Sequence, residues 1–200
     1  MATNSLGEMN NWDWGHAVER FLREWAKRRG DWVLAVSEIA TGGAPMLEGA
    51  DGRIIAADSL FCRDGVTRFT EFKGKARATK NQQRGRWEHG IDAHQWEAYQ
   101  KLCTVSGLKG NLMIWQADTR KIFEGSFEDI AVGAAFWAGD PSRRNLAYCQ
   151  PMWYFDLRRF QDYDWDGDQL LPVNPPSARV PDNVRVWEQN QPLSRQLPLI

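Results

Sequence analysis

One apolar stripe along residues 13–29 constrains the fold first, because a helix with such a stripe must pack it against a core. Its apolar residues recur every three to four positions, the period of one helix face: Trp14, Ala17, Val18, Phe21, Leu22 and Trp25. Gly30 follows three cations at 27–29, which is typical of a helix C-terminus. The pattern predicts an amphipathic helix.

Strand-like segments come next. Residues 31–39 predict a strand, and the turn-rich residues 41–52 are expected to carry the chain across the edge of the sheet. Two more strands are predicted at 53–62 and 66–74. The short polar link Arg63-Asp64-Gly65 between them favours a hairpin.

A helical pattern is predicted from Asn81 to about Ser106, most clearly over 92–105, where apolar residues repeat on one face. Residues 111–117 form a compact apolar run that predicts a strand, and 121–125 predict its hairpin partner. Residues 146–157 indicate one more strand and a short helix. No internal repeat of 20 to 50 residues is present, which argues against a solenoid or propeller.

Composition indicates a folded protein, with 42% hydrophobic and 26% charged residues. The longest apolar run, IAVGAAFWAG, is far shorter than the roughly 20 residues that span a bilayer. We expect no membrane span and see no secretory signal. The three widely spaced cysteines suit reduced thiols, so a cytoplasmic location is expected.

The last 29 residues hold six of the nine prolines. This composition predicts an extended or irregular tail. We therefore divide the chain into a folded domain at 1–171 and a Pro-rich C-terminal extension at 172–200. The extension contains a tryptophan and is a candidate docking segment for a protein partner or a second copy of the chain.

Asp58, Glu71 and Lys73 are the candidate catalytic residues. Residues two apart in a strand share a face, so Glu71 and Lys73 project together, and Asp58 is placed close to Glu71 across the predicted hairpin. Two converging carboxylates repel each other unless a cation lies between them, and oxygen ligands suit Mg²⁺ or Mn²⁺. A nearby lysine can orient a water or balance charge on a phosphate.

These residues resemble the motif of the PD-(D/E)XK nucleases, which include restriction endonucleases, Holliday junction resolvases and repair exonucleases. The resemblance covers roughly residues 13–125. It implies an α/β fold with a restriction-endonuclease-like core, in which helices flank a central mixed β-sheet. It also implies that Asp58 and Glu71 bind the divalent ion and that Lys73 is the catalytic lysine.

Further residues match positions that recur in this family. Glu19 matches a first-helix glutamate that acts as a metal ligand or in catalysis, and Glu24 competes for that place. Gln95 and Tyr99 match a Gln and a Tyr early in the second helix, which implies a part in substrate binding. The proline that often precedes the first acid is missing here, since Ala57 stands before Asp58.

Simpler interpretations remain open for several of these residues. An isolated Glu-x-Lys pair usually marks a solvated strand face, so the interpretation rests on the whole set. Asp51 is a rival for the first metal ligand, although its Asp-Gly pair is typical of a turn.

Six cations and no acidic residue lie between Phe72 and Trp87. Besides Lys73, they are the candidate contacts to a nucleic-acid backbone: Lys75, Arg77, Lys80, Arg84 and Arg86. A solvated loop is the alternative. With a net charge of only −1, nucleic-acid binding has to be argued from this local patch.

The 11 tryptophans are core residues by default, notably Trp14, Trp25, Trp32 and Trp115. Trp87 is a candidate for stacking on a base or ribose, although packing is the simpler interpretation. His89 follows the basic stretch and is expected at the surface, with a contact to substrate as the alternative. None of His16, His89 and His94 has the spacing of a zinc site.

The sequence therefore predicts a divalent-metal-dependent nuclease that hydrolyses phosphodiester bonds, with DNA favoured as substrate by the resemblance. Two alternatives remain. One is a nucleic-acid-binding module on the same fold that no longer turns over. The other is an interaction protein that docks through its tail.

Overall fold

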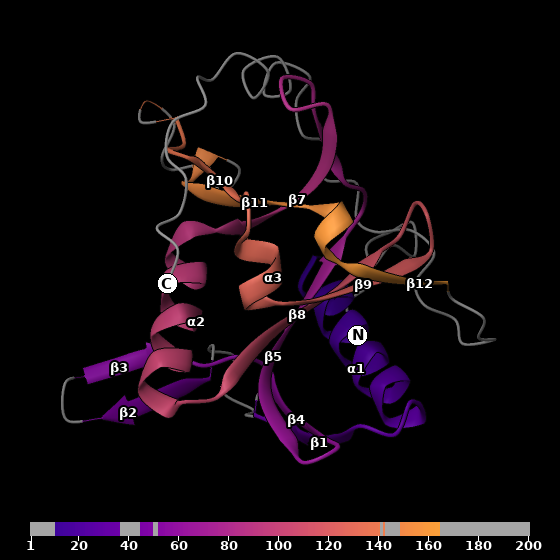
Figure 1. The fold of residues 1–200 in the computed structure, drawn as a ribbon, viewed down its shortest axis with the longest axis vertical. Coiled ribbons are helices and arrows are strands. Elements are labelled where there is room, and N and C mark those ends of the chain that lie inside the picture. The colour runs from indigo at the N-terminus through magenta and orange to yellow at the C-terminus, as the bar shows by residue number, and fades with distance from the viewer. Residues whose placement is uncertain (1–10, 37–44, 50–51, 141, 143–148, 165–200) are drawn as a thin grey trace.

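The computed structural model describes residues 11–36, 45–49, 52–140, 142 and 149–164 (Figure 1). A six-stranded mixed sheet lies at its centre, in the order β1-β4-β5-β8-β9-β12. Only β5 and β8 pair in parallel within this sheet. Its strands are β1 (Trp32–Ala35), β4 (Ser59–Arg63), β5 (Val66–Lys75), β8 (Lys109–Gln116), β9 (Lys121–Ser126) and β12 (Gln161–Asp164).

Two smaller sheets and the helices complete the described part of the chain. The four-stranded sheet has the order β10 (Ala135–Trp137), β11 (Met152–Asp156), β7 (Arg86–Asp92) and β6 (Thr79–Asn81). The two-stranded sheet pairs β2 (Met46–Gly49) with β3 (Gly52–Ile55). The helices are α1 (Asn11–Arg28), α2 (Ala93–Ser106), α3 (Phe127–Ala131) and the 3₁₀ helix η3 (Leu157–Arg159).

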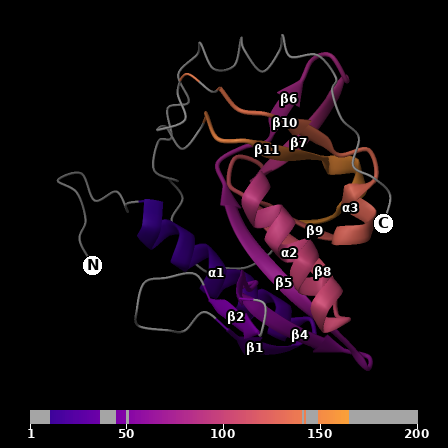
Figure 2. The same cartoon turned by 90° about the vertical axis from the view of Figure 1, so that its left-hand side faces the viewer.

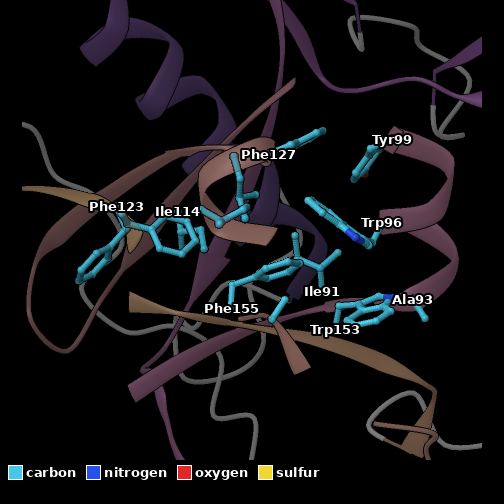
Figure 3. Packing of buried hydrophobic residues seen from close by; sticks show 13 residues of the cluster. Ile91, Ala93, Trp96, Tyr99, Ile114, Phe123, Phe127, Trp153 and Phe155 are labelled. Carbon is cyan, nitrogen blue, oxygen red and sulfur yellow. The ribbon is translucent and has the colours of Figure 1, made fainter. Parts of the chain in front are cut away.

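The central strand β8 is buried on both faces, and its residues alternate between two apolar clusters. Met113 and Trp115 pack with α1. Leu112 and Ile114 pack in the other cluster, which contains α2 residues such as Trp96 together with residues of α3 and β11 (Figure 3). Because successive residues of a strand point to opposite faces, α1 and α2 cover opposite sides of the sheet (Figure 2).

The side chains of β5 alternate between the two faces of the sheet in the same way. Phe72 belongs to the cluster around α1. Gly74 also faces α1, because a Cβ added there would lie 2.2 Å from the Trp14 ring. Glu71 and Lys73 therefore face the other side of the sheet, where α2 lies. The predicted α/β class, with a central mixed sheet flanked by helices, is confirmed.

The predicted hairpin between residues 53–62 and 66–74 is confirmed for β4 and β5, which pair from Ser59 opposite Thr70 to Arg63 opposite Val66. Asp64 and Gly65 form the turn, both with positive φ angles of 52° and 76°. Two positive φ angles in succession are typical of the tight turn whose twist matches that of the strands. The strand predicted at 53–62 is interrupted, since β3 ends at Ile55 and β4 begins at Ser59.

The prediction of a helix from Asn81 onward was wrong for residues 81–92. These residues instead form the end of β6, a turn, and β7. Gly85 takes a positive φ of 62° in the turn, and the Asn81 side chain accepts a hydrogen bond from the Arg84 backbone N–H. β7 is then held by β6 on one side and by β11 on the other. Long-range pairing therefore overrides the local pattern.

Other expectations also need correction. Trp32 is 80% exposed and is no core residue, because its strand β1 is an edge strand with one face uncovered. Trp14, Trp25 and Trp115 are buried as expected. The turn-rich stretch 41–52 contains β2, and the sequence pattern missed four elements: β6, α3, β10 and β12.

Three further expectations concern the whole chain. Cys62, Cys103 and Cys149 are free thiols. Within the part of the chain that the structure describes, no helix is both long enough and apolar enough to cross a bilayer. The Pro-rich extension lies outside the described residues, so the boundary at 171 and any docking role of the tail stay predictions.

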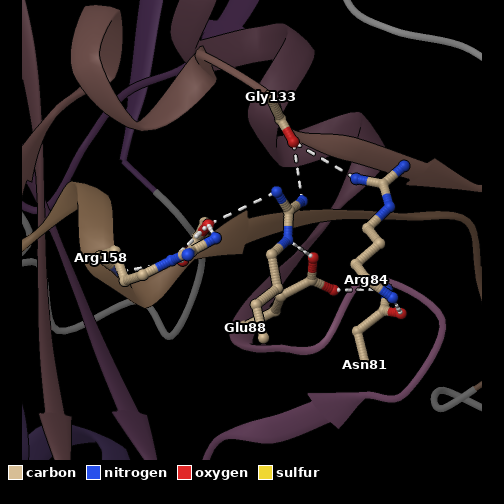
Figure 4. A network of polar contacts seen from close by, with 7 residues as sticks. Asn81, Arg84, Glu88, Gly133 and Arg158 are labelled. Carbon is tan, nitrogen blue, oxygen red and sulfur yellow. Dashed lines mark hydrogen bonds and ion pairs between the residues drawn. The ribbon is translucent and has the colours of Figure 1, made fainter.

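A buried ionic network anchors β7 (Figure 4). The Arg86 guanidinium bonds the Glu88 and Asp156 carboxylates and donates a 2.7 Å hydrogen bond to the carbonyl oxygen of Gly133. Glu88 also accepts a hydrogen bond from Asn81. Arg86 thus joins β7 to β11 and to the segment after α3.

We expect Arg86→Ala to lower the free energy of unfolding by about 3 kcal/mol or more, because it leaves two buried carboxylates without their shared cation. Arg158→Ala is the matched control, since Arg158 also binds Asp156 but is 75% exposed. It should leave the unfolding free energy nearly unchanged. Urea denaturation of both variants measures the difference, and equal losses would contradict the role given to Arg86.

Candidate active site

The end of the β4–β5 hairpin brings three of the predicted residues together. Asp58 directly precedes β4, and its Oδ2 accepts a 2.9 Å hydrogen bond from the backbone N–H of Phe72 on β5. This bond places the Asp58 carboxylate beside Glu71 and Lys73. The side chains of these two residues project from the face of β5 opposite to that of Phe72. The hairpin register therefore builds the cluster.

Glu71 and Lys73 form a direct ion pair, with Lys73 Nζ 2.6 Å from Glu71 Oε1. Glu71 is only 3% exposed, and its second oxygen, Oε2, is buried without a hydrogen-bond partner. Burial alone would lower the pKa of Lys73, but the charge of Glu71, with those of Asp58 and Asp92, raises it overall. The lysine is thereby held in its charged form.

The pKa of Asp58 lies well above its ordinary value. Burial is the main cause, and the negative charges of Glu71 and Glu19 add to it. Lys73 and the Phe72 N–H act in the opposite direction without cancelling the effect. The carboxylates here are crowded enough that an added cation would relieve their repulsion.

Helix α2 contributes Tyr99, which is 2% exposed and lies near enough to Glu71 for the charge of that carboxylate to act on its hydroxyl. Burial and then the charge of Glu71 raise the pKa of Tyr99, so its hydroxyl stays protonated and serves as a donor. Gln95 lies one turn earlier on the same helix, and its Oε1 is buried without a hydrogen-bond partner. Both predicted α2 residues therefore lie on the side of the sheet that Glu71 faces.

Of the two candidates on α1, Glu19 is the one near the site. Its charge acts on Asp58, while its carboxylate pairs with Arg23 Nη2 and His16 Nδ1, each at 3.4 Å. Glu24 pairs with Lys27 at the surface, and both side chains are at least half exposed. The rival ligand Asp51 lies outside the described residues.

The donor set fits a small, hard cation. Asp58 and Glu71 offer carboxylate oxygens, one of them a buried oxygen without a partner. Mg²⁺ is commonly held by one or two carboxylates and otherwise by water. Among the described residues, no three His, Cys, Asp or Glu side chains converge closely enough to form a complete protein cage. A site of two carboxylates and water matches these residues better.

A second polar cluster, which the sequence did not suggest, continues from the first along β5. Lys75 is paired in register with Gln116 on β8. Its positive charge acts on His89 of β7, which is 2% exposed, so the expected surface position of this histidine was wrong. His89 Nε2 and Gln116 Oε1 are both buried without a hydrogen-bond partner.

Asp92 links the two clusters electrostatically and was also missed. It stands at the N-cap of α2, a position where an aspartate normally bonds the helix backbone. Here it makes no such side-chain bond, and its charge acts on Lys73, Lys75 and Tyr99. Burial and the charge of Lys73 lower the pKa of Lys75 to about 8, while Asp92 partly opposes this shift.

The remaining predicted cations lie on or near the β6–β7 hairpin, and they differ in their surroundings. Arg77 and Lys80 are exposed. Arg84 donates a hydrogen bond to the Gly133 carbonyl, and Arg86 belongs to the internal network described above. The patch is therefore a folded hairpin in which two of the arginines are turned inward.

His89 should make stability depend on pH. Burial, followed by the charge of Lys75, lowers the pKa of His89 to about 3, below its unfolded value near 6.5. As pH falls below 6.5, His89 binds a proton in the unfolded chain but stays neutral in the folded chain. Stability is therefore lost, by about 2 kcal/mol at pH 5.

Urea denaturation at pH 7.5 and pH 5 measures this loss. His89→Phe keeps an aromatic ring against Phe123 and removes the titration, so the variant should lose about 2 kcal/mol less than the wild type between the two pH values. Every other contribution to the pH dependence is common to both proteins and cancels in the comparison. An equal pH dependence in both proteins would contradict the assignment.

No family model matches this chain, and no curated protein matches it by sequence. Solved structures that are similar to it include Hjc, a Holliday junction resolvase from the archaeal hyperthermophile Archaeoglobus fulgidus. That likeness covers 73% of this chain and 91% of that one, at 10% identity and a TM-score of 0.43. D212, a nuclease from a fusselovirus, matches 73% of this chain and 80% of its own, at 10% identity and a TM-score of 0.36.

Proposed function

We propose that this protein is a divalent-metal-dependent nuclease that hydrolyses phosphodiester bonds in nucleic acid, with DNA as the substrate that the motif resemblance favours. One observation carries the proposal. Two carboxylates, the buried Glu71 and the half-buried Asp58, lie beside a charged lysine, and one oxygen of Glu71 is buried without a partner. A carboxyl group with a displaced pKa, such as Asp58, beside a second carboxylate and a lysine is typical of catalytic sites.

Asp58 and Glu71 would hold Mg²⁺ or Mn²⁺. Glu19, predicted as an auxiliary ligand or water-orienting group, would orient a water, because no third carboxylate among the described residues converges with these two. The bound ion supplies Lewis-acid polarisation of the phosphate and a more acidic water. The raised pKa of Asp58 supports this assignment, because a cation between crowded carboxylates removes their repulsion.

Lys73 acts in its charged form. Its raised pKa makes it a poor base at neutral pH, so it would position the attacking water and stabilise negative charge on the phosphate. In the reaction a water oxygen would bond to phosphorus and lose a proton to bulk water, while the bond to the leaving oxygen breaks and that oxygen takes up a proton from bulk water. Tyr99, whose hydroxyl stays protonated beside Glu71, would orient that carboxylate by donating a hydrogen bond to it.

Substrate contacts are proposed for Lys75 and Gln95 beside the site and for Arg77 and Lys80 on the hairpin. Lys75 shares the strand face of Glu71 and Lys73, so it would meet the phosphate next to the one that is cut. Arg84 and Arg86, predicted in the same role, would act chiefly by holding the hairpin in place.

Metal-dependent cleavage should disappear in Asp58→Asn, Glu71→Gln and Lys73→Met, each with a loss of at least about 100-fold. Cleavage of labelled single-stranded, duplex and branched DNA, and of RNA, in Mg²⁺, Mn²⁺ or EDTA measures this loss. Salt-dependent binding without cleavage by the wild type would instead establish a binding module that does not turn over. Cleavage that survives in EDTA would contradict the metal assignment.

The two acids of α1 provide a matched pair. Glu19→Gln should reduce the cleavage rate and raise the Mg²⁺ concentration needed for half-maximal rate, because Glu19 acts on Asp58. Glu24→Gln makes the same chemical change on the same helix at an exposed position and should behave as wild type. Similar effects of the two substitutions would remove Glu19 from the site.

A further inference from the structure

The β6–β7 hairpin, which we call the arm, presents an exposed aromatic side chain. Trp87 is 52% exposed, whereas most described tryptophans are buried. Lys80 lies directly opposite Trp87 in the register, and its Nζ is 5.8 Å from the centre of the Trp87 ring. In Figure 2 the arm stands at the top of the molecule, at the opposite end from β1.

The two faces of the arm differ in their chemistry. Arg86 and Glu88 share one face, and the buried network of Asn81, Asp156 and Gly133 holds it in place (Figure 4). Lys80 and Trp87 share the other face, because residues directly opposite in a strand pair point to the same side. A cation and an aromatic ring are thus displayed on a rigidly anchored hairpin.

The exposed face of the arm leads toward the proposed active site. His89 lies two residues after Trp87 on β7 and therefore on the same face. Lys75 lies near enough to His89 for its charge to act on the imidazole, and it shares the β5 face of Glu71 and Lys73. One side of the molecule thus runs from Glu71 along β5, past His89, to Trp87.

We propose that this side binds one strand of the substrate, with its phosphates on Lys75 and Lys80 and an unpaired base stacked on Trp87. This inference rests on the proposed nuclease site and names its substrate class, which is nucleic acid with unpaired nucleotides beside the cut. A base inside a continuous duplex is already stacked on both faces. An unpaired base offers a free face to an aromatic ring and tolerates any sequence.

The choice of nucleic acid follows from charge. Four cations on or leading to the arm form no ion pair with a carboxylate in the part of the chain that the structure describes: Lys75, Arg77, Lys80 and Arg84. A polyanion is the complementary partner. Trp32 is even more exposed, at 80%, but lies on β1 at the far end of the sheet, which makes it a matched control.

The test measures binding of the full chain in EDTA by fluorescence anisotropy, so that no cleavage occurs. The probes are labelled oligothymidylate, the same strand with several abasic positions, and a blunt duplex of equal length. Trp87→Ala should weaken binding of oligothymidylate by about tenfold or more, Trp87→Phe by much less, and Trp32→Ala not at all. Duplex binding should be the same in all four proteins.

The abasic strand isolates stacking from charge. Wild type should bind it about tenfold more weakly than oligothymidylate, and Trp87→Ala should bind the two strands equally. If Trp87→Ala still distinguishes them as wild type does, or loses duplex and single-strand binding alike, the inference is overturned. Cleavage in Mg²⁺ is read separately, so a protein that shows the Trp87 effect but never cuts would refute the proposed nuclease alone.

Discussion

The parallel pairing of β5 with β8 is the constraint from which the rest of the arrangement follows. Parallel neighbours cannot be joined by a tight turn, so the chain must leave the sheet and return. It does so through β6, β7 and α2. The same detour brings Tyr99 to Glu71 and places β7 where His89 meets Lys75. A topological requirement of the sheet thereby assembles the polar side chains on one of its faces.

Strand alternation then separates two kinds of surface. On one face, Phe72 and Met113 close an apolar core under α1. On the other, Glu71 and Lys73 stand in a partly buried polar row beside α2. Burial disfavours the charged forms of Asp58, Lys75 and His89 and is the main reason why their pKa values are displaced, and like charges nearby add to each shift. The apolar layer under α1 holds the hairpin that carries these charges.

Elements with local causes could be predicted from sequence, whereas those fixed by distant partners could not. The α1 stripe and the Asp64-Gly65 turn have local causes, so the helix and the hairpin were predicted, and with them the proximity of Asp58 and Glu71. β7 depends on β11, some sixty residues away in sequence, so its local pattern was misread as helical. His89 was misplaced for the same reason. Asp92 fell inside the predicted helix, and only its surroundings in the fold distinguish it.

The tight turn at Asp64 and Gly65 has a consequence for how this gene can vary. One residue added there, if the strand slid to absorb it, would exchange the two faces of β5 and drive Glu71 and Lys73 into the apolar layer beneath α1. Two added residues would preserve the facing. Functional variants of this turn should therefore carry insertions of an even number of residues. An odd number should be tolerated only where a β-bulge takes up the extra residue.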